Sequence, residues 1–266
     1  MQLQSIEDIQ QQHRHIYLSP HFDDAVLSCG GSIAMQTQIN LQPLIITIFA
    51  APPADGAALN PFARQIQASA GLGESGADAV ARRREEDRAA CDYLGADYLW
   101  LNYADAMYRG YDSSESLFGD IGRNDLSLEE SLADVALKIH ALAPNAVIYA
   151  PLGVGHHVDH QLVASAAARL VNQKANIKFY EDIPYATKPN TLQARQTELK
   201  INMEPEMNEV SFQMDNKLNA VALYASQISP LFTTEANMRR EISTYSKTIK
   251  PANSHIAIER FWAWDA

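Results

Sequence analysis

Residues 15–31 read HIYLSPHFDDAVLSCGG, and this stretch decides the fold. A short run of β-type composition is broken by a Ser-Pro pair. A histidine and two adjacent aspartates follow, and then comes an apolar segment with helical spacing. A strand that ends, a polar turn and a helix that begins together form the first βα unit of an α/β fold. Small molecules bind beyond the carboxyl ends of the strands in such folds, so the sequence predicts a site in this turn.

The alternation of strand and helix continues along the chain. Residues 44–50 form a continuous apolar run, which is typical of a strand buried on both faces of a parallel sheet. We therefore predict a Rossmann-like, mostly parallel sheet with helices on both faces. The predicted strands are 15–19, 44–50, 98–102, 146–150 and 177–180, and the predicted helices are 25–39, 79–94, 128–142 and 162–171.

Two parts of the chain depart from this pattern. Residues 51–78 are rich in proline and glycine and are predicted to form a long loop, either a lid or binding loop or a disordered segment. Beyond residue 181 we predict a C-terminal α+β extension of the same domain, so that one domain spans 1–266, with a core at about 15–180. The predicted elements of the extension are strands 210–214 and 255–264 and helices 217–227 and 235–245.

The composition argues against several kinds of partner and location. A formal net charge of −11 disfavours a nucleic-acid partner and docking on an anionic membrane, because both need a basic face. Cys29 and Cys91 form neither a disulfide framework nor a thiolate zinc site. We expect a cytoplasmic protein without an integral membrane segment, because no apolar run approaches about 18 residues and the first residues lack the apolar part of a signal peptide. The oligomeric state, a homo-oligomer included, stays open.

Two polar clusters follow two of the predicted strands. Parallel-sheet geometry can bring such loops together at one edge, and imidazoles with carboxylates suit zinc or iron. The six residues are His21, Asp23 and Asp24 after the first strand and His157, Asp159 and His160 after the fourth. Taken alone, His21 reads as a hydrogen-bonded loop histidine and Asp24 as a helix N-cap. The joint pattern instead predicts a metal site.

The two clusters contain motifs of a known family. Residues 20–24, PHFDD, resemble the P-H-x-D-D motif of the PIG-L (LmbE-like) de-N-acetylases, and residues 157–160, HVDH, resemble their H-x-D-H motif. Residues 83–95 are similar to the R-x-x-E…L-G helix of that family, and residues 102–109 are similar to its substrate loop. The family often has Glu where Ala25 stands, a departure outside the liganding positions.

The resemblance, which covers about residues 15–180, implies a zinc-dependent amide hydrolase. It implies that His21, Asp24 and His160 bind Zn²⁺ and that Asp23 is the general base acting on water at the metal. The products would be acetate and a free amine. The acyl group need not be acetyl, and the rest of the substrate stays open between a lipid, a thiol precursor, a nucleotide and a natural product.

Four further residues receive roles from the same resemblance. A protonated His157 would stabilise the oxyanion, with Asp159 as its orienting partner. A helical turn would place His157 on the same side as the ligand three residues later, which favours it over the neighbouring His156. Arg83 and Asp105 would hold the sugar ring of an N-acetylated glycoside. The alternative for Arg83 is a solvated charge in the run from 82 to 88.

Two other functions remain open at this point. Two histidines and one aspartate also form the facial triad of non-haem iron oxygenases, which would replace Zn²⁺ by Fe²⁺. The fold could also serve a non-catalytic sugar-binding protein. Asp23 and His157 favour hydrolysis, because a hydrolase needs a base and an oxyanion donor.

Overall fold

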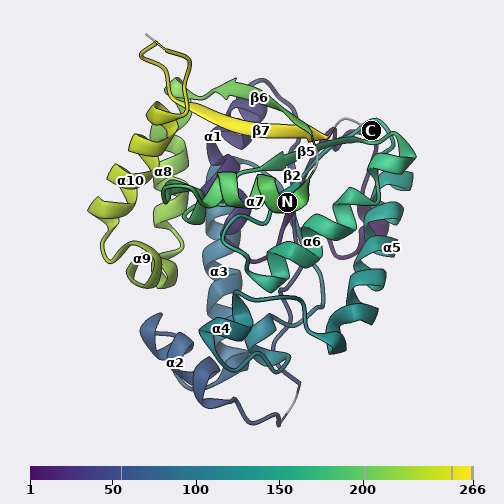
Figure 1. Ribbon diagram of the computed structural model, residues 1–266, viewed down its shortest axis with the longest axis vertical. Helices are drawn as coiled ribbons and strands as arrows, with labels where there is room; N and C mark the ends of the chain where they lie inside the picture. Colours follow the sequence, from purple (N-terminus) through teal and green to yellow (C-terminus); the bar gives the residue numbers. More distant parts are fainter. Residues whose placement is uncertain (55, 201, 253, 265–266) are drawn as a thin grey trace.

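The computed structural model describes residues 1–54, 56–200, 202–252 and 254–264. In these residues seven strands form one sheet in the order β3-β2-β1-β4-β5-β7-β6 (Figure 1). The pairs among β1 to β5 are parallel, whereas β7 pairs antiparallel with both β5 and β6. The strands are β1 (His15–Ser19), β2 (Leu44–Thr47), β3 (Asp97–Trp100), β4 (Val147–Pro151), β5 (Asn176–Tyr180), β6 (Met203–Glu209) and β7 (Ile258–Trp264).

The helices mostly follow the strands as connections. α3 begins after Ser75, whose side chain accepts the N–H of Asp78, and ends at Gly95, whose φ of 69° is a conformation that glycine adopts easily. The α-helices are α1 (Asp24–Gln38), α2 (Pro61–Ser69), α3 (Gly76–Leu94), α4 (Ser114–Leu117), α5 (Leu126–Leu142), α6 (Val158–Ala168), α7 (Thr191–Leu199), α8 (Met214–Ala222), α9 (Ala225–Phe232) and α10 (Glu235–Thr248). Short 3₁₀ turns are η1 (Ile6–Asp8), η2 (Ala106–Tyr108), η3 (Arg123–Asp125), η4 (Val171–Gln173), η5 (Tyr185–Thr187) and η6 (Ser211–Gln213).

The sheet separates two hydrophobic cores. Tyr17 and Ile45 point to one face, where α1, α3, α8 and α10 pack. Ile16, Leu18 and Ile46 point to the other face, where α5 and α6 pack (Figure 1). Successive side chains of a strand alternate between faces, so a sheet covered on both sides needs apolar residues at every position. This is why the parallel strands read as continuous apolar runs.

The predicted fold class is confirmed, and all five parallel strands and their four connecting helices occur where the sequence placed them, within a few residues. The segment predicted to be a loop contains α2. This helix begins after Asn60, whose side chain accepts the N–H of Ala63, and has Pro61 at its first position. Both residues are favoured at helix starts. The prediction of an unstructured loop was therefore wrong for 61–69.

The strand predicted at 210–214 was also wrong. Val210 and Met214 are buried, but they precede and begin helical segments, and Phe212 between them is 93% exposed. The actual strand, β6, has the sequence MEPEMNE and lies at the edge of the sheet, where it is largely exposed. An exposed edge strand buries little on either face, so it carries no apolar alternation, and it tolerates Pro205.

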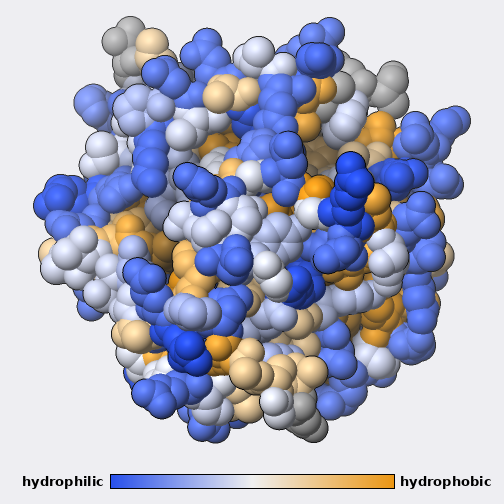
Figure 2. Space-filling model, turned by 60° about the horizontal axis from the view of Figure 1, so that its bottom comes forward, coloured by the Kyte–Doolittle hydropathy of each residue, from blue (hydrophilic) through white to orange (hydrophobic). Residues whose placement is uncertain are grey.

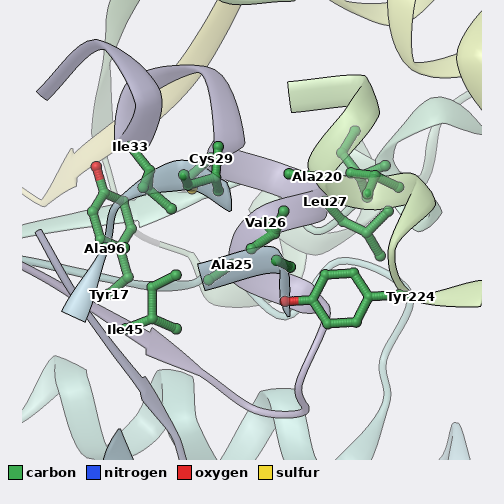
Figure 3. Close-up of a cluster of buried hydrophobic side chains, with 14 of the residues drawn as sticks. Tyr17, Ala25, Val26, Leu27, Cys29, Ile33, Ile45, Ala96, Ala220 and Tyr224 are labelled. Atoms are coloured by element: carbon green, nitrogen blue, oxygen red, sulfur yellow. The ribbon is translucent and has the colours of Figure 1, made fainter. Parts of the chain in front are cut away.

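The C-terminal elements are tied to α1 by a buried polar cluster. Lys217 on α8 pairs with Glu259 on β7 at 2.7 Å, and the same carboxylate accepts the backbone N–H groups of Gly31 and Ser32 at 2.9 and 2.8 Å. A Cβ on Gly31 would lie 2.8 Å from the Cβ of Val210, closer than such atoms approach. Figure 3 shows the apolar part of the same contact, with Leu27 of α1 near Ala220 and Tyr224.

The order of the strands indicates by itself where a binding site forms, without reference to any side chain. From β1 the chain moves outward through β2 to β3, and then returns to β4 on the other side of β1. The connections that leave β1 and β4 therefore run in opposite directions, and a crevice forms at the carboxyl ends of these two strands. Both polar clusters predicted from the sequence follow these strands.

Candidate metal and catalytic site

The loops that follow β1 and β4 bring the two clusters together. Among the described residues, two groups of buried side chains have ligand atoms within 4.8 Å of one another, and His21 belongs to both. The first group is His21, Asp24 and His160, and the second is His21, His157 and Asp159. The first group is the ligand set that the resemblance implied.

Asp24 lies at the centre of the first group. Its Oδ2 is 3.2 Å from Nδ1 of His21 and 3.3 Å from Nε2 of His160, and it accepts the backbone N–H of His21 at 2.8 Å. Nε2 of His160 is buried and makes no hydrogen bond within the described residues. A buried ring nitrogen without a partner, beside a carboxylate and a second imidazole, fits a divalent cation with two nitrogen ligands and one oxygen ligand.

Each imidazole of this group is held by a carboxylate at its other nitrogen. Nδ1 of His160 lies 2.7 Å from Oδ1 of Asp182, whose Oδ2 accepts the N–H of Val154 at 2.9 Å. Nε2 of His21 lies 3.0 Å from Oδ2 of Asp159. Such carboxylates fix the tautomer and orientation of metal-binding histidines. Burial alone would lower the pKa of His160. The charges and hydrogen bonds of Asp24 and Asp182 outweigh this effect and raise that pKa to about 9.

Sequence reasoning missed Asp182. It stands two residues after the end of β5, beside β4 in the sheet, and is 1% exposed. The available signal was its position, because a carboxylate just beyond the carboxyl end of a parallel strand lies at the edge where the site forms.

Asp159 has a different partner from the one predicted. Its carboxylate faces His21 and also accepts the N–H of Ala106 at 3.0 Å and Nη2 of Arg109 at 2.7 Å. Burial alone would raise the pKa of Asp159, but the hydrogen bond from His21 and the charge of Arg109 outweigh it and keep that pKa below its usual value. His157 is oriented instead by the backbone of Asp159, whose N–H donates to Nδ1 at 3.2 Å. The reason is that His157 is the N-cap of α6.

This geometry opposes the protonated His157 that the resemblance implied. Burial, followed by the charge of His21, lowers the pKa of His157 well below its ordinary value. A ring that accepts a hydrogen bond at Nδ1 carries its proton at Nε2 when it is neutral. The neutral ring can therefore still donate one hydrogen bond to an oxyanion from Nε2. His156 lies elsewhere, against the carbonyl of Gly119 and the carboxylate of Glu198.

Arg83 contacts the predicted base. Its Nη2 donates to Oδ1 of Asp23 at 2.6 Å, and its guanidinium lies 5.3 Å from the centroid of the Phe22 ring. The side chain is 12% exposed, so the alternative of a solvated surface charge is wrong. Burial and the nearby charge of Asp24 raise the pKa of Asp23, while Arg83 opposes the increase.

A cavity of about 380 Å³ opens onto these residues. Asp23, Asp24, Arg83, Asp105 and His157 all line it. Oδ2 of Asp105 lies 3.5 Å from Nε2 of the His21 ring, and its Oδ1 accepts the N–H of Met107. The predicted base and both predicted sugar contacts therefore face one space.

One glycine shapes the turn after β4. Gly155 has a φ of 91°, and a Cβ there would lie 2.4 Å from Cγ of Tyr185. Only glycine fits this close approach without displacing Tyr185, whose ring stands edge-on to His160 at 5.8 Å. The PLGVG sequence before the second cluster thus helps to set the position of a candidate ligand.

The fold and the site define a Rossmann-like α/β protein with a buried centre of imidazoles and carboxylates. The family profile described as GlcNAc-PI de-N-acetylase (PIG-L) matches residues 16–171. The 2'-N-acetylparomamine deacetylase of Streptomyces fradiae is 31% identical over 222 residues, which are 80% of this chain and 73% of that protein. The chain belongs to the PIG-L family of de-N-acetylases.

Two further matches extend over most of the chain. The 2'-N-acetylparomamine deacetylase of Niallia circulans is 28% identical over 247 residues, which are 86% of each protein. The solved structure of the A40926 pseudoaglycone deacetylase matches with a TM-score of 0.76 and 25% identity, and covers 96% of this chain and 99% of its own. In the described part of the chain, no helix is long and apolar enough to cross a membrane.

Proposed function

We propose that this protein is a metal-dependent hydrolase that removes an N-acetyl group from a small glycoside containing an amino sugar, with acetate and a free amine as products. The observation that carries the proposal is the convergence of two imidazoles on Asp24, with Nε2 of His160 left without a hydrogen bond. Two relatives that cover most of the chain are named as deacetylases of an N-acetylated aminoglycoside, which supports this substrate class.

The metal would be held by His21, Asp24 and His160. Zn²⁺ bound there would act as a Lewis acid on the amide oxygen and would lower the pKa of water. Fe²⁺ suits the same ligands and is the alternative that metal analysis must decide. Asp159 and Asp182 would keep the two imidazoles oriented, because each carboxylate contacts the ring nitrogen that faces away from Asp24.

Asp23 would take the proton of the attacking water. The Arg83 guanidinium aims this carboxylate through the 2.6 Å contact and favours its ionised form. When the C–N bond of the tetrahedral intermediate breaks, the same proton can pass to the leaving nitrogen. His157 would donate its Nε2–H to the oxyanion, a hydrogen bond made only as negative charge develops.

The C-terminal residues would belong to the same catalytic domain. β7 lies between β5 and β6 in one sheet, and Glu259 bonds to the backbone of α1. We therefore retain the proposal of a single domain over residues 1–266, acting on a small molecule. The cytoplasmic location stays a prediction.

Acetate release tests the proposal. Purified protein would be treated with a chelator, divided, and supplied with Zn²⁺, Fe²⁺ or no metal, and then given 2'-N-acetylparomamine and N-acetylglucosamine glycosides. We expect acetate from the protein that has regained metal and little from the protein without it. Equal release without metal would contradict metal dependence. No release from any substrate, with full metal occupancy, would contradict the proposed hydrolase.

A further inference from the structure

The cavity has apolar walls in addition to the polar residues of the site. α2, α4 with the residue that follows it, and α9 are far apart in the sequence and contribute side chains to the same space. We call these side chains the apolar wall, and its members are Phe62, Ile66, Leu117, Phe118, Pro230 and Leu231. Figure 2 turns toward the viewer the end of the molecule that carries α2 and α4, and hydrophobic surface is visible there between polar side chains.

The apolar wall begins beside the catalytic residues. The ring of Phe118 stands edge-on to His157 with 5.4 Å between centroids, and edge-on to Tyr185 at 5.9 Å. Phe118 is 38% exposed, which is unusual for a large aromatic side chain and leaves its surface available to a ligand. A group attached to a substrate whose amide lies at His157 would therefore meet this ring first.

The wall is held in place by polar contacts outside it. The side chain of Asn60 caps α2 and donates to the carbonyl of Met107 at 3.2 Å, and Gln67 donates to the hydroxyl of Tyr108 at 2.6 Å. These bonds fix α2 to η2. Phe62 and Ile66 are therefore held at the cavity although their own side chains are only partly buried. A preformed apolar surface binds with a smaller ordering cost than a flexible one.

α9 is anchored in the same manner. The carboxylate of Glu86 on α3 accepts the backbone N–H of Ser226 at 2.9 Å and its hydroxyl at 2.6 Å. Glu86 stands three residues after Arg83, which pairs with the predicted base. The helix that orients Asp23 therefore also positions the side of the cavity formed by Pro230 and Leu231.

The charges of the cavity lie only among the residues of the proposed site. Its other polar lining residues are uncharged at neutral pH. The titratable side chains that line it within the described residues are His21, Asp23, Asp24, Arg83, Asp105, His157 and the hydroxyls of Tyr108 and Tyr185, and the uncharged polar ones are Gln65, Gln67, Ser69, Ser114 and Gln227. An ammonium group bound against the apolar wall would lose hydration without gaining an ion pair, whereas an apolar group would gain by burial.

We propose that the substrate carries an uncharged apolar group joined to its N-acylated amino sugar, and that the apolar wall binds this group. The inference rests on the proposed function and adds the chemical class of the second substrate moiety. A volume of about 380 Å³ lies within the range of cavities that enclose ligands of several rings. The apolar group can be an aglycone on the sugar or a longer chain on the acylated nitrogen, and both present the same chemistry to the wall.

The test compares kcat/KM across one series of substrates with the metal-loaded protein. The methyl glycoside of N-acetylglucosamine is the reference. Its octyl and phenyl glycosides test an apolar aglycone, the methyl glycoside of N-octanoylglucosamine tests an apolar acyl chain, and 2'-N-acetylparomamine tests a cationic group. We expect kcat/KM to rise at least about tenfold in the aglycone arm or the acyl arm, mainly through KM, and not for the cationic substrate.

Two variants on separate helices connect the preference to the wall. Phe62→Ser on α2 and Leu231→Ser on α9 should each reduce the tenfold preference to about twofold or less. Phe212→Ser, which changes an exposed phenylalanine outside the cavity, should keep the preference and the basal activity. Thermal melting of all three variants identifies any variant that has lost its fold. If one wall variant has done so, the substrate preference of the other wall variant decides whether the wall binds the apolar group.

The outcomes separate this inference from the proposed function. Acetate release from the reference substrate with no gain from either apolar arm would overturn the apolar subsite and leave the hydrolase intact. So would a preference for the cationic substrate, or a preference that both folded wall variants keep. No hydrolysis of any substrate by metal-loaded protein would overturn both.

Discussion

The five parallel strands and the C-terminal extension form one sheet but contribute differently. The parallel strands are short and buried, and the candidate metal-binding residues stand in the turns after β1 and β4 and at the starts of α1 and α6. The extension adds antiparallel strands, one of them exposed, and packs α8 against α1 and α3, with α10 against α8 and β7. In the extension, the described residues contribute to neither of the groups able to hold a metal.

The difference follows from strand direction. Parallel strands all present their carboxyl ends at one edge, so consecutive βα turns meet there and their polar side chains converge. β6 and β7 run antiparallel to each other, so their carboxyl ends, and the segments that follow them, lie at opposite ends of the strands. Apart from Asp182 behind His160 and the side chains of α9 that line the cavity, the extension supplies support, as in the contact of Glu259 with α1 and that of Tyr224 with Asp87 on α3. Changes in the residues proposed for chemistry should therefore remove activity, and changes in the supporting contacts of the extension should alter stability.

The largest effect is expected from His160→Ala in the parallel half. The variant removes one of only three predicted protein ligands, so both metal and activity should be lost. Elemental analysis of the purified variant beside the wild type measures the first, and acetate release measures the second. Lys217→Ala in the extension is the contrasting variant. It should reduce stability but removes none of the predicted metal ligands. Full metal occupancy in His160→Ala would contradict the ligand assignment.

Asp23→Asn should come next in size. The amide cannot accept the proton of water, so kcat should fall by roughly 10²–10⁴-fold, the usual contribution of a positioned base. Metal content should stay near that of the wild type, because Asp23 belongs to neither candidate metal group. Loss of metal together with activity would mean that the two adjacent aspartates exchange or share their roles.

His157→Ala should lower kcat by about 10²–10³-fold, the effect of removing one oxyanion donor, with little change in metal content. His156→Ala is the matched control and should keep kcat, because that ring contacts Gly119 and Glu198 instead. Burial makes the His157 ring neutral at pH 7, so the variant should keep the alkaline limb of its pH–rate profile. Disappearance of that limb would support the protonated ring implied by the sequence.

Asp182→Asn should weaken metal binding by about 10–100-fold, the usual effect of removing a carboxylate behind a histidine ligand. The 2.7 Å contact with His160 would change from a charged acceptor to an amide. Competition with a chelator measures the metal affinity, and excess metal should restore much of the activity. A metal affinity equal to that of the wild type would show that Asp182 has no orienting role.

The smallest effect concerns stability at the contact between the two regions. Burial raises the pKa of Asp87 to about 7, against the hydrogen bonds donated by Trp100 and Tyr224, which lower it. The folded state thus keeps a proton that the unfolded state loses near 3.8, and stability falls as pH rises between these values. Between about pH 5.5 and pH 7 the loss should be about 2 kcal/mol.

Urea unfolding at pH 5.5 and pH 7.5 measures this loss, with Asp87→Asn as the variant that cannot ionise. The wild-type free energy of unfolding should fall more than that of the variant by roughly the stated 2 kcal/mol. Equal pH dependence in the two proteins would contradict a change in the protonation of Asp87 between these two pH values.

The sequence alone determined those strands, turns and helices whose structure depends on residues close to one another along the chain. The run from His15 to Gly31 contains a strand, a turn and a helix, and the strand was placed with its observed bounds, His15–Ser19. Apolar runs marked the other parallel strands because both sides of those strands are buried. The motifs of the candidate ligands were found because their residue types and spacing are rare, and the implied set His21, Asp24 and His160 does converge.

The tertiary structure alone decided which partners the polar groups take. The carboxylate of Asp159 bonds to His21, Arg83 bonds to Asp23, and Asp182 lies behind His160. None of these contacts follows from spacing along the chain, because each joins residues far apart in the sequence that become neighbours only when the strands pair. The same holds for β6, whose edge position removes the apolar pattern that would have marked it. Local composition specifies the elements, and the order of the strands specifies which side chains meet.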